Sequence, residues 1–295
     1  MNTSFRKIRA MRLILAACLA AGLACAALIA SPTQALADDA PLSAPKTVKA
    51  TATKQCTVKL RWSKVPNAIG YTIYWSKNKN KGYRAVDYVP SYRSSFTHTE
   101  AIAGAKNYYK ITAVGPSGND SPLSKAAGVK VGSAFKNSFV KFTLPKYWRG
   151  KVCITEKKHN AQFKSVYIRD AKTGGTLAWI DWSKKHNENG GDISSHWVKS
   201  LRRGKGSVEL WVNSWATNLY FSKYVIHDGN PSVYSDDYSN ERKLTTAETN
   251  RLIKLQTGGK FSYKKVKKVP ESKIGKYSNI ADKYIAKNLK IKVVK

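Results

Sequence analysis

Acidic residues and cysteines are scarce in this chain of 295 residues. It has 18 Asp and Glu against 52 Lys and Arg, and only four cysteines. Few carboxylates are therefore available to pair for acid–base catalysis, and neighbouring lysines would neutralise many of them. The five histidines show no paired spacing for zinc. Because no motif for catalysis stands out, we expect a protein that is not an enzyme and that uses no cofactor or metal ion.

The longest hydrophobic run lies near the N-terminus, after a basic start. An unbroken apolar run, Leu13–Ala30, is followed by an Ala-Leu-Ala site at 35–37. This order is typical of a secretory signal peptide, so we expect residues 1–37 to be removed and the mature chain to be secreted or associated with the cell surface. Two alternatives stay open: an uncleaved membrane span, which would make the membrane a partner, and lipidation at Cys18.

The net charge is strongly positive. It is +34 for the whole chain and +30 after loss of the four basic residues of the signal, Arg6, Lys7, Arg9 and Arg12. Outside a cell this excess favours polyanions such as wall teichoic acids, anionic lipid head groups, sulfated or sialylated host glycans and released DNA. The alternative is a dispersed basic surface that only keeps the protein soluble. The candidate polyanion-binding residues lie in the C-terminal tail: Lys260, Lys264, Lys265, Lys267, Lys268, Lys273 and Lys276.

After a linker at 38–44, residues 45–131 consist of short stretches in which apolar residues alternate. A period of two with one buried face predicts the strands of an all-β sandwich. The alternating residues form three runs: Val58, Leu60 and Trp62; Tyr71, Ile73 and Trp75; Tyr109, Ile111 and Ala113.

These stretches resemble the fibronectin type III family at 60–62, 70–74 and 109–114, with Gly118 and Ser121-Pro122 following. The resemblance implies a β-sandwich that serves as a spacer or adhesive unit beside another domain. The family's tyrosine-corner position aligns with Asn107, so either the corner is lost or the strand is shifted by one residue. There is no Arg-Gly-Asp triplet, which leaves integrin-type recognition without support.

A second linker, 132–137, precedes another β-rich region at 138–240. Strands are predicted at 151–155, 165–169 and 176–182, and a hairpin is predicted from 207–215 and 218–226. We expect a second β-sandwich or jelly-roll-like domain. The run 142–152 is similar to segments of secreted actinobacterial proteins of unassigned function, which assigns no activity.

The last segment, 241–295, differs in kind. Thr245 and Glu248 form a capping box, which predicts a helix to about Gln256 that ends at Gly258-Gly259. We expect this helix and a basic C-terminal extension. The segment carries no sorting signal and no hydrophobic tail, so we expect no covalent anchoring to a cell wall.

One strand face of the predicted hairpin carries aromatic residues. Alternate positions of this strand are the apolar residues Val208, Leu210 and Val212, which therefore lie on one face of the sheet. The residues between them, Glu209 included, lie on the opposite face. That face gathers a candidate glycan platform: Trp211, Asn213, Trp215, Tyr220 and Tyr224. Flat rings bind the apolar faces of sugars, and polar neighbours hold sugar hydroxyls. The alternative is that these aromatic residues pack beneath another element.

Two cysteines, Cys56 and Cys153, remain after removal of the signal. An even pair in an exported protein indicates a disulfide, here between the two β-domains. The alternative is two unrelated thiols, because Cys56 shares the parity of buried core residues. A nucleophilic Cys153 would need His159 beside it and an oxyanion donor.

A calcium-binding loop and a pair of catalytic carboxylates have weaker support in the sequence. Residues 187–192 supply oxygen atoms for calcium but lack the EF-hand order, so a plain loop is expected. Five carboxylates qualify by type alone for a hydrolytic pair, although no motif positions any two of them: Asp170, Asp181, Glu188, Asp192 and Glu209.

The sequence therefore favours a non-catalytic, secreted, bacterial cell-envelope or adhesion-type protein. It would bind an anionic wall polymer or a host glycan, act as a monomer, and use no nucleotide cofactor. One alternative is a carbohydrate- or peptidoglycan-active hydrolase with a fibronectin type III accessory module. The other is a module that binds a surface protein.

Overall fold

The computed structural model describes residues 41–184, 195–203, 206–213, 225–227, 230–232, 242–243, 245–260 and 274–294. The expected signal peptide lies outside these residues. The chain divides into two compact units, the first reaching to residue 129 and the second containing all residues from 130 onward. Two short segments of the first half, 52–57 and 99–105, also belong to the second unit. None of the described helices is long and apolar enough to cross a membrane.

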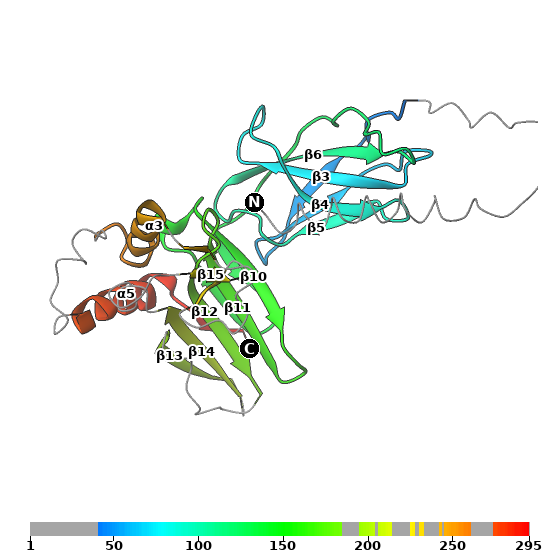
Figure 1. Cartoon of the computed structure of the whole chain (residues 1–295). Helices are drawn as coiled ribbons and strands as arrows, with labels where there is room; N and C mark the ends of the chain where they lie inside the picture. The colour runs from blue at the N-terminus through cyan, green and yellow to red at the C-terminus, as the bar shows by residue number, and fades with distance from the viewer. Residues whose placement is uncertain are drawn as a thin grey trace, which may run out of the picture. The chain divides into compact units, whose positions relative to one another are not determined.

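The first unit is a β-sandwich of two sheets (Figure 1). One sheet has the strand order β1-β2-β5 and the other the order β4-β3-β6-β7. Their bounds are β1 (Lys49–Ala52), β2 (Val58–Arg61), β3 (Gly70–Ser76), β4 (Arg84–Pro90), β5 (Ser95–His98), β6 (Lys106–Val114) and β7 (Ala127–Lys130). All nine alternating residues predicted for the core are buried, because strand parity turns them toward the facing sheet.

The tyrosine corner is lost in this sandwich. Asn107 is fully buried at the aligned position and its Oδ1 accepts a hydrogen bond from Trp75 Nε1 at 2.8 Å. The buried tyrosine of the same strand is Tyr109, whose hydroxyl lies 2.9 Å from Nδ1 of His98 rather than on an upstream backbone group. A side-chain pair therefore replaces the corner's backbone bond.

The second unit is built on a five-stranded antiparallel sheet with the order β10-β11-β12-β14-β13. Its strands are β10 (Val152–Lys158), β11 (Phe163–Asp170), β12 (Thr176–Ser183), β13 (Ser195–Arg203) and β14 (Gly206–Asn213). Two smaller sheets accompany it, β18-β9-β8 and β16-β15-β17. Their strands are β8 (Ala134–Lys136), β9 (Val140–Thr143), β15 (Val225–His227), β16 (Asn230–Ser232), β17 (Arg242–Lys243) and β18 (Lys292–Val293).

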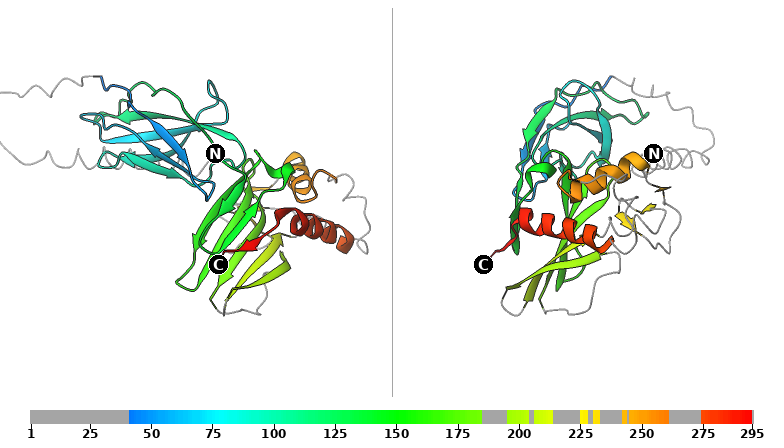
Figure 2. Two further views of the ribbon diagram at one scale, coloured as in Figure 1. Left: turned by 180° about the vertical axis from the view of Figure 1, so that it is seen from behind. Right: turned by 90° about the vertical axis from the view of Figure 1, so that its left-hand side faces the viewer.

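Two helices, α3 (Thr246–Gln256) and α5 (Ile274–Leu289), lie on one side of the large sheet and contact β12, β13 and β14 (Figures 1 and 2). A short 3-10 helix, η1 (Lys146–Trp148), precedes β10. On the face of the sheet that the helices cover, the strands present apolar side chains that are all buried: Ile154, Val166, Ile168, Ile180, Val208 and Leu210. The helices bury Leu252, Ile253, Leu255, Ala281, Ile285 and Leu289 in return. The C-terminal segment is thus part of the core of the second unit.

The expected fold class is confirmed as a mostly β chain with a fibronectin-like region and two C-terminal helices. The capping box of Thr245 and Glu248 is present, and α3 ends at Gln256 as predicted. The cover of the large sheet is helical where we expected a second sheet. The predicted hairpin of 207–215 with 218–226 is wrong, because β12 and β13 already occupy both edges of β14.

Candidate functional site

The face of the large sheet opposite the helices carries a row of aromatic side chains. Tyr167 on β11, Trp179 on β12 and Trp211 on β14 are successive cross-strand partners. The two indole planes differ by only 8°, with ring centroids 6.2 Å apart. All three side chains are partly exposed. Tyr167 and Trp179 are likewise direct neighbours on one face of the sheet, and we call these three residues the aromatic row.

Two carboxylates lie beside the aromatic row, two residues away along the strands. Asp181 on β12 and Glu209 on β14 are direct cross-strand partners. Glu209 is 8% exposed. Burial raises the pKa of Asp181 to about 6, and the neighbouring charge of Glu209 adds to the rise. Aromatic rings and hydrogen-bond acceptors thus share one side of the sheet.

Asp181 is held in place by its neighbours. Ser165 Oγ donates a hydrogen bond to Asp181 Oδ1 at 2.6 Å, and Trp179 Nε1 donates to Oδ2 at 3.2 Å. His159 Nε2 lies 2.9 Å from Ser165 Oγ. A catalytic triad places the histidine between the serine and the acid, whereas here the serine is the middle member. This chain of hydrogen bonds therefore orients Trp179 and does not activate a serine nucleophile.

Two buried N–H groups on this face have no hydrogen-bond partner within the described part of the chain: Trp211 Nε1 and Arg169 Nε. The Arg169 guanidinium carbon lies 5.0 Å from the ring centroid of Tyr167, at the end of the aromatic row. An unsatisfied buried donor costs about 1–3 kcal/mol. Such donors point to an acceptor that a ligand or a water molecule would supply.

Basic side chains lie at the margins of this face. Lys157 on β10 is the cross-strand partner of Ser165, and Arg202 on β13 is the partner of Ser207; both are exposed. The centre of the face is acidic and its margins are basic. An anionic group of a ligand would be favoured at the margins and repelled at the centre.

The sequence located part of this site. Trp211 and Glu209 lie opposite the buried Val208 and Leu210, as the parity predicted. Asn213 ends β14, and its side chain is not described. Three of the predicted platform residues lie outside the described residues: Trp215, Tyr220 and Tyr224.

Sequence reasoning missed two members of the site, Tyr167 and Trp179. It named Asp181 only by residue type, and it placed Glu209 on the face of Trp211 without pairing the two carboxylates. A signal was present, because Trp179 and Asp181 alternate with the buried Ala178 and Ile180 within the strand predicted at 176–182. Only the strand order placed β12 beside β14.

The basic tail is described in part. Lys260 is exposed just after α3, and Lys276 lies in α5, although its side chain is not described. The other predicted polyanion-binding residues lie outside the described residues: Lys264, Lys265, Lys267, Lys268 and Lys273. Polyanion binding by this tail stays a prediction.

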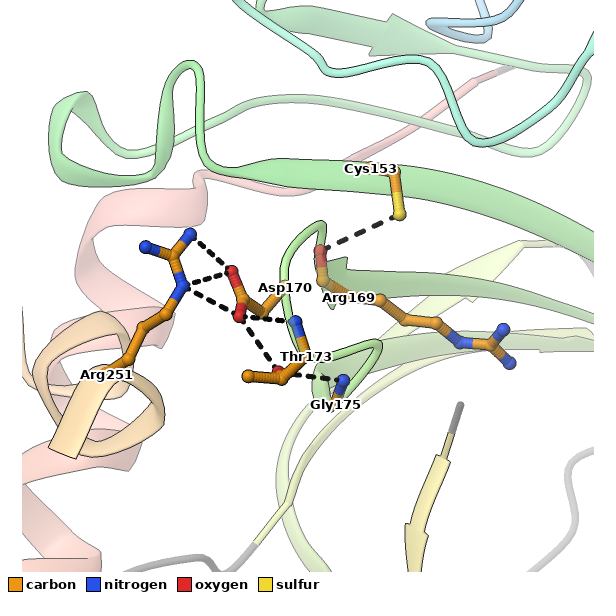
Figure 3. Close-up of polar contacts among 6 residues, drawn as sticks. All are labelled: Cys153, Arg169, Asp170, Thr173, Gly175 and Arg251. Atoms are coloured by element: carbon orange, nitrogen blue, oxygen red, sulfur yellow. Dashed lines mark hydrogen bonds and ion pairs between the residues drawn. The ribbon is translucent and has the colours of Figure 1, made fainter. Parts of the chain in front are cut away.

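The disulfide between Cys56 and Cys153 is not formed, and both are buried free thiols. Cys56 Sγ faces the carbonyls of Gly132 and Ala134, at 3.6 and 3.5 Å. Cys153 Sγ instead faces the carbonyl of Arg169 at 3.9 Å (Figure 3). Burial raises the pKa of Cys56 to about 11 and that of Cys153 to about 12. A thiol held neutral in this way is a poor nucleophile, which leaves the cysteine-nucleophile hypothesis without support.

Asp170, another sequence candidate, has a structural role (Figure 3). It is fully buried on the helix-covered face and accepts hydrogen bonds from Arg251 of α3, with Nε at 2.8 Å and Nη2 at 2.6 Å. Thr173 donates to it from both its backbone N–H and its hydroxyl. The carboxylate thus ties α3 to the turn between β11 and β12.

The remaining candidates are two carboxylates and the loop considered for calcium. Glu188, Asp192 and the loop 187–192 lie outside the described residues. Within the described segments, no group of three or more histidine, cysteine, aspartate or glutamate side chains could hold a metal ion.

No protein-family model matches the whole chain or any part of it. The chain is 34% identical over 93 residues to a poly(3-hydroxybutyrate) depolymerase of Ralstonia pickettii, which is 32% of this chain but 17% of that enzyme. The first unit has its strands in sheets of three and four. The expected resemblance is confirmed to this extent: fibronectin type III domains are among the solved structures that are similar to about a third of the chain.

Solved structures with this fold are similar to about a third of the chain. A fibronectin-like protein from Clostridium thermocellum covers 31% of the chain and 95% of its own length, with 22% identity and a TM-score of 0.29. The fibronectin domain of human contactin 1 covers 40% and 96%, with 21% identity and a TM-score of 0.30. A β-1,2-glucanase from Parabacteroides distasonis covers 34% of this chain and 14% of its own, with 24% identity and a TM-score of 0.29.

Proposed function

We propose that this protein is a secreted, non-catalytic bacterial surface protein that binds a glycan on the face formed by the aromatic row, Asp181 and Glu209. The observation that carries the proposal is the pair of parallel, partly exposed indoles of Trp179 and Trp211 beside two carboxylates. Flat rings take up the apolar face of a sugar, while carboxylate oxygens accept hydrogen bonds from its hydroxyl groups.

The tryptophans of the core differ from this pair. Trp148 is fully buried, and its Nε1 donates to the carbonyl of Leu255 at 2.7 Å; Trp62 is 5% exposed. Trp179 and Trp211 stay partly exposed on a face that the helices do not cover. A contiguous exposed aromatic surface is typical of an interaction site.

The charge distribution favours a glycan with anionic substituents at its edges. The sugar rings would lie on the aromatic row, and phosphate, sulfate or carboxylate groups would reach Lys157 and Arg202. The net charge of the chain favours the approach of such a polymer from a distance. The fibronectin type III domain would act as the spacer, and its likeness to a small part of a depolymerase supports an accessory role.

The test is binding of the mature chain to isolated cell wall, to mucin and to a panel of defined glycans. The variant Trp179→Ala/Trp211→Ala should lose about tenfold or more in affinity with little change in melting temperature. Tyr92→Ala is the matched control, since Tyr92 is 70% exposed on the fibronectin domain. Unchanged binding by the double variant, or a melting temperature lowered by several degrees with binding intact, would show that the pair is structural.

A second candidate is a glycoside hydrolase, favoured by the carboxylate pair. A carboxyl group with a raised pKa can act as a general acid beside a second carboxylate, and burial raises the pKa of Asp181 to about 6. Release of reducing ends from a wall or mucin polysaccharide, abolished by Asp181→Asn and by Glu209→Gln, would establish this activity. Binding without release supports the first proposal.

A further inference from the structure

The hydrogen-bond donors and acceptors next to the aromatic row differ in how many partners they have. Asp181 accepts two hydrogen bonds, from Ser165 and Trp179, and a carboxylate can accept about four. Trp211 Nε1 is a donor, and it has no partner within the described segments. The site therefore offers an unused donor on β14 and acceptor capacity on β12, two residues apart along the strands.

An acetamido group matches this arrangement. Its carbonyl accepts one hydrogen bond, its N–H donates one, and its methyl group is apolar. A free amino group is a cation, which Asp181 and Glu209 would attract, but it supplies no acceptor for Trp211 Nε1 and no methyl group for the indole rings. A plain hydroxyl group has no methyl group to pack against an indole ring.

We propose that the aromatic face selects a sugar that carries an acetamido group, with its carbonyl on Trp211 Nε1, its N–H toward Asp181 or Glu209, and its methyl group against the indole rings. This inference rests on the proposed glycan-binding function. Because Trp211 Nε1 is covered in the unliganded protein, the indole shifts when the sugar binds and gains the hydrogen bond that it lacks. N-acetylated amino sugars occur in bacterial walls and in host glycans, so both sources remain open.

The test compares three β-1,4-linked tetrasaccharides that differ at one substituent: N-acetylglucosamine, glucosamine and glucose. The mature chain should bind the N-acetylated tetramer about tenfold more tightly than the glucose tetramer, as expected for one added hydrogen bond to a buried donor and one buried methyl group. Trp211→Phe keeps a ring and removes the N–H, so this preference should fall to about twofold. Trp62→Phe is the matched control, because Trp62 Nε1 is also buried with no hydrogen-bond partner among the described residues but belongs to the other unit.

A spectroscopic measurement keeps the test independent of how the variants fold. The indole N–H resonance of Trp211 in the unmodified protein should shift with the N-acetylated tetramer and stay in place with the glucose tetramer at saturation. Equal affinity for these two tetramers, or no shift of that resonance, would overturn the inference and leave glycan binding intact. Failure to bind any tetramer, isolated wall or mucin would overturn the proposed function itself. Comparison of isolated wall with mucin then distinguishes the two sources.

Discussion

Acidification should destabilise the first unit, the fibronectin-like sandwich, through His98. This side chain is 6% exposed at the end of β5, and its Nδ1 lies 2.9 Å from the hydroxyl of Tyr109. Its ring lies among the rings of Trp75, Phe96 and Tyr109. Burial and, to a smaller extent, the charge of Arg84 together lower the pKa of His98 from 6.5 to about 4.

The sign and size of the effect follow from proton linkage. Above pH 6.5 the imidazole is neutral in both states and has no effect on stability. Between pH 6.5 and about 4 the unfolded chain binds a proton that the folded domain does not, so stability falls as the pH falls. At 1.36 kcal/mol per pKa unit the full loss is about 3 kcal/mol, which is a large part of the usual stability of 5–15 kcal/mol.

Urea unfolding of the mature chain at several pH values between 7.5 and 4, followed by tryptophan fluorescence, measures this loss. The control is His98→Gln, which keeps a neutral polar side chain next to Tyr109 and cannot gain a proton. Other titrating groups contribute equally to both proteins, so the difference between their pH profiles isolates His98. If the two profiles are parallel from pH 7.5 to 4, the reasoning about this histidine is wrong.

Three further predictions concern the second unit and the charge. Arg251→Gln leaves the fully buried carboxylate of Asp170 without its cation and should lower the free energy of unfolding in urea by about 3 kcal/mol. Adding Asp170→Asn to the same chain removes the buried charge and should recover part of this loss. No recovery would contradict the role of the ion pair. Gly258→Ala should lower the melting temperature by several degrees more than Gly118→Ala. Both glycines have a positive φ, but only at Gly258 would the new Cβ meet a side chain, the ring of Tyr284. Equal effects of the two variants would refute the clash. Binding to heparin should weaken steeply as salt rises, and equal binding in low salt and in about 0.5 M salt would show that charge does not drive it.

The local features of this fold could be predicted from the sequence. The alternation of Val58, Leu60 and Trp62 is set by the pleat of a strand and needs no knowledge of its partner. The capping box of Thr245 and Glu248 closes within four residues, so its signal is likewise local. The alternation of side chains along a strand is also local, so the position of Glu209 on the face opposite the core could be predicted as well.

Strand order, helix cover and thiol placement were decided by contacts between residues that are distant in the sequence. The platform hypothesis paired 207–215 with the segment that follows it, but β14 lies between β12 and β13. That order places Trp179 against Trp211 and Asp181 against Glu209, across about thirty residues of sequence. Composition alone could not indicate which strands become neighbours, because the free energy of pairing depends on which faces the whole unit can bury.

The sequence by itself determined the alternating strands, the resemblance to a fibronectin type III sandwich, the start and end of α3 and the positive charge, because each depends on residues close together in the chain or on composition. The tertiary structure alone decided that the C-terminal helix α5 belongs to a core, that Cys56 and Cys153 stay apart, and that two carboxylates meet beside two parallel indoles. Each of these depends on the burial of a shared apolar face by segments far apart in the sequence, and no local pattern records that choice.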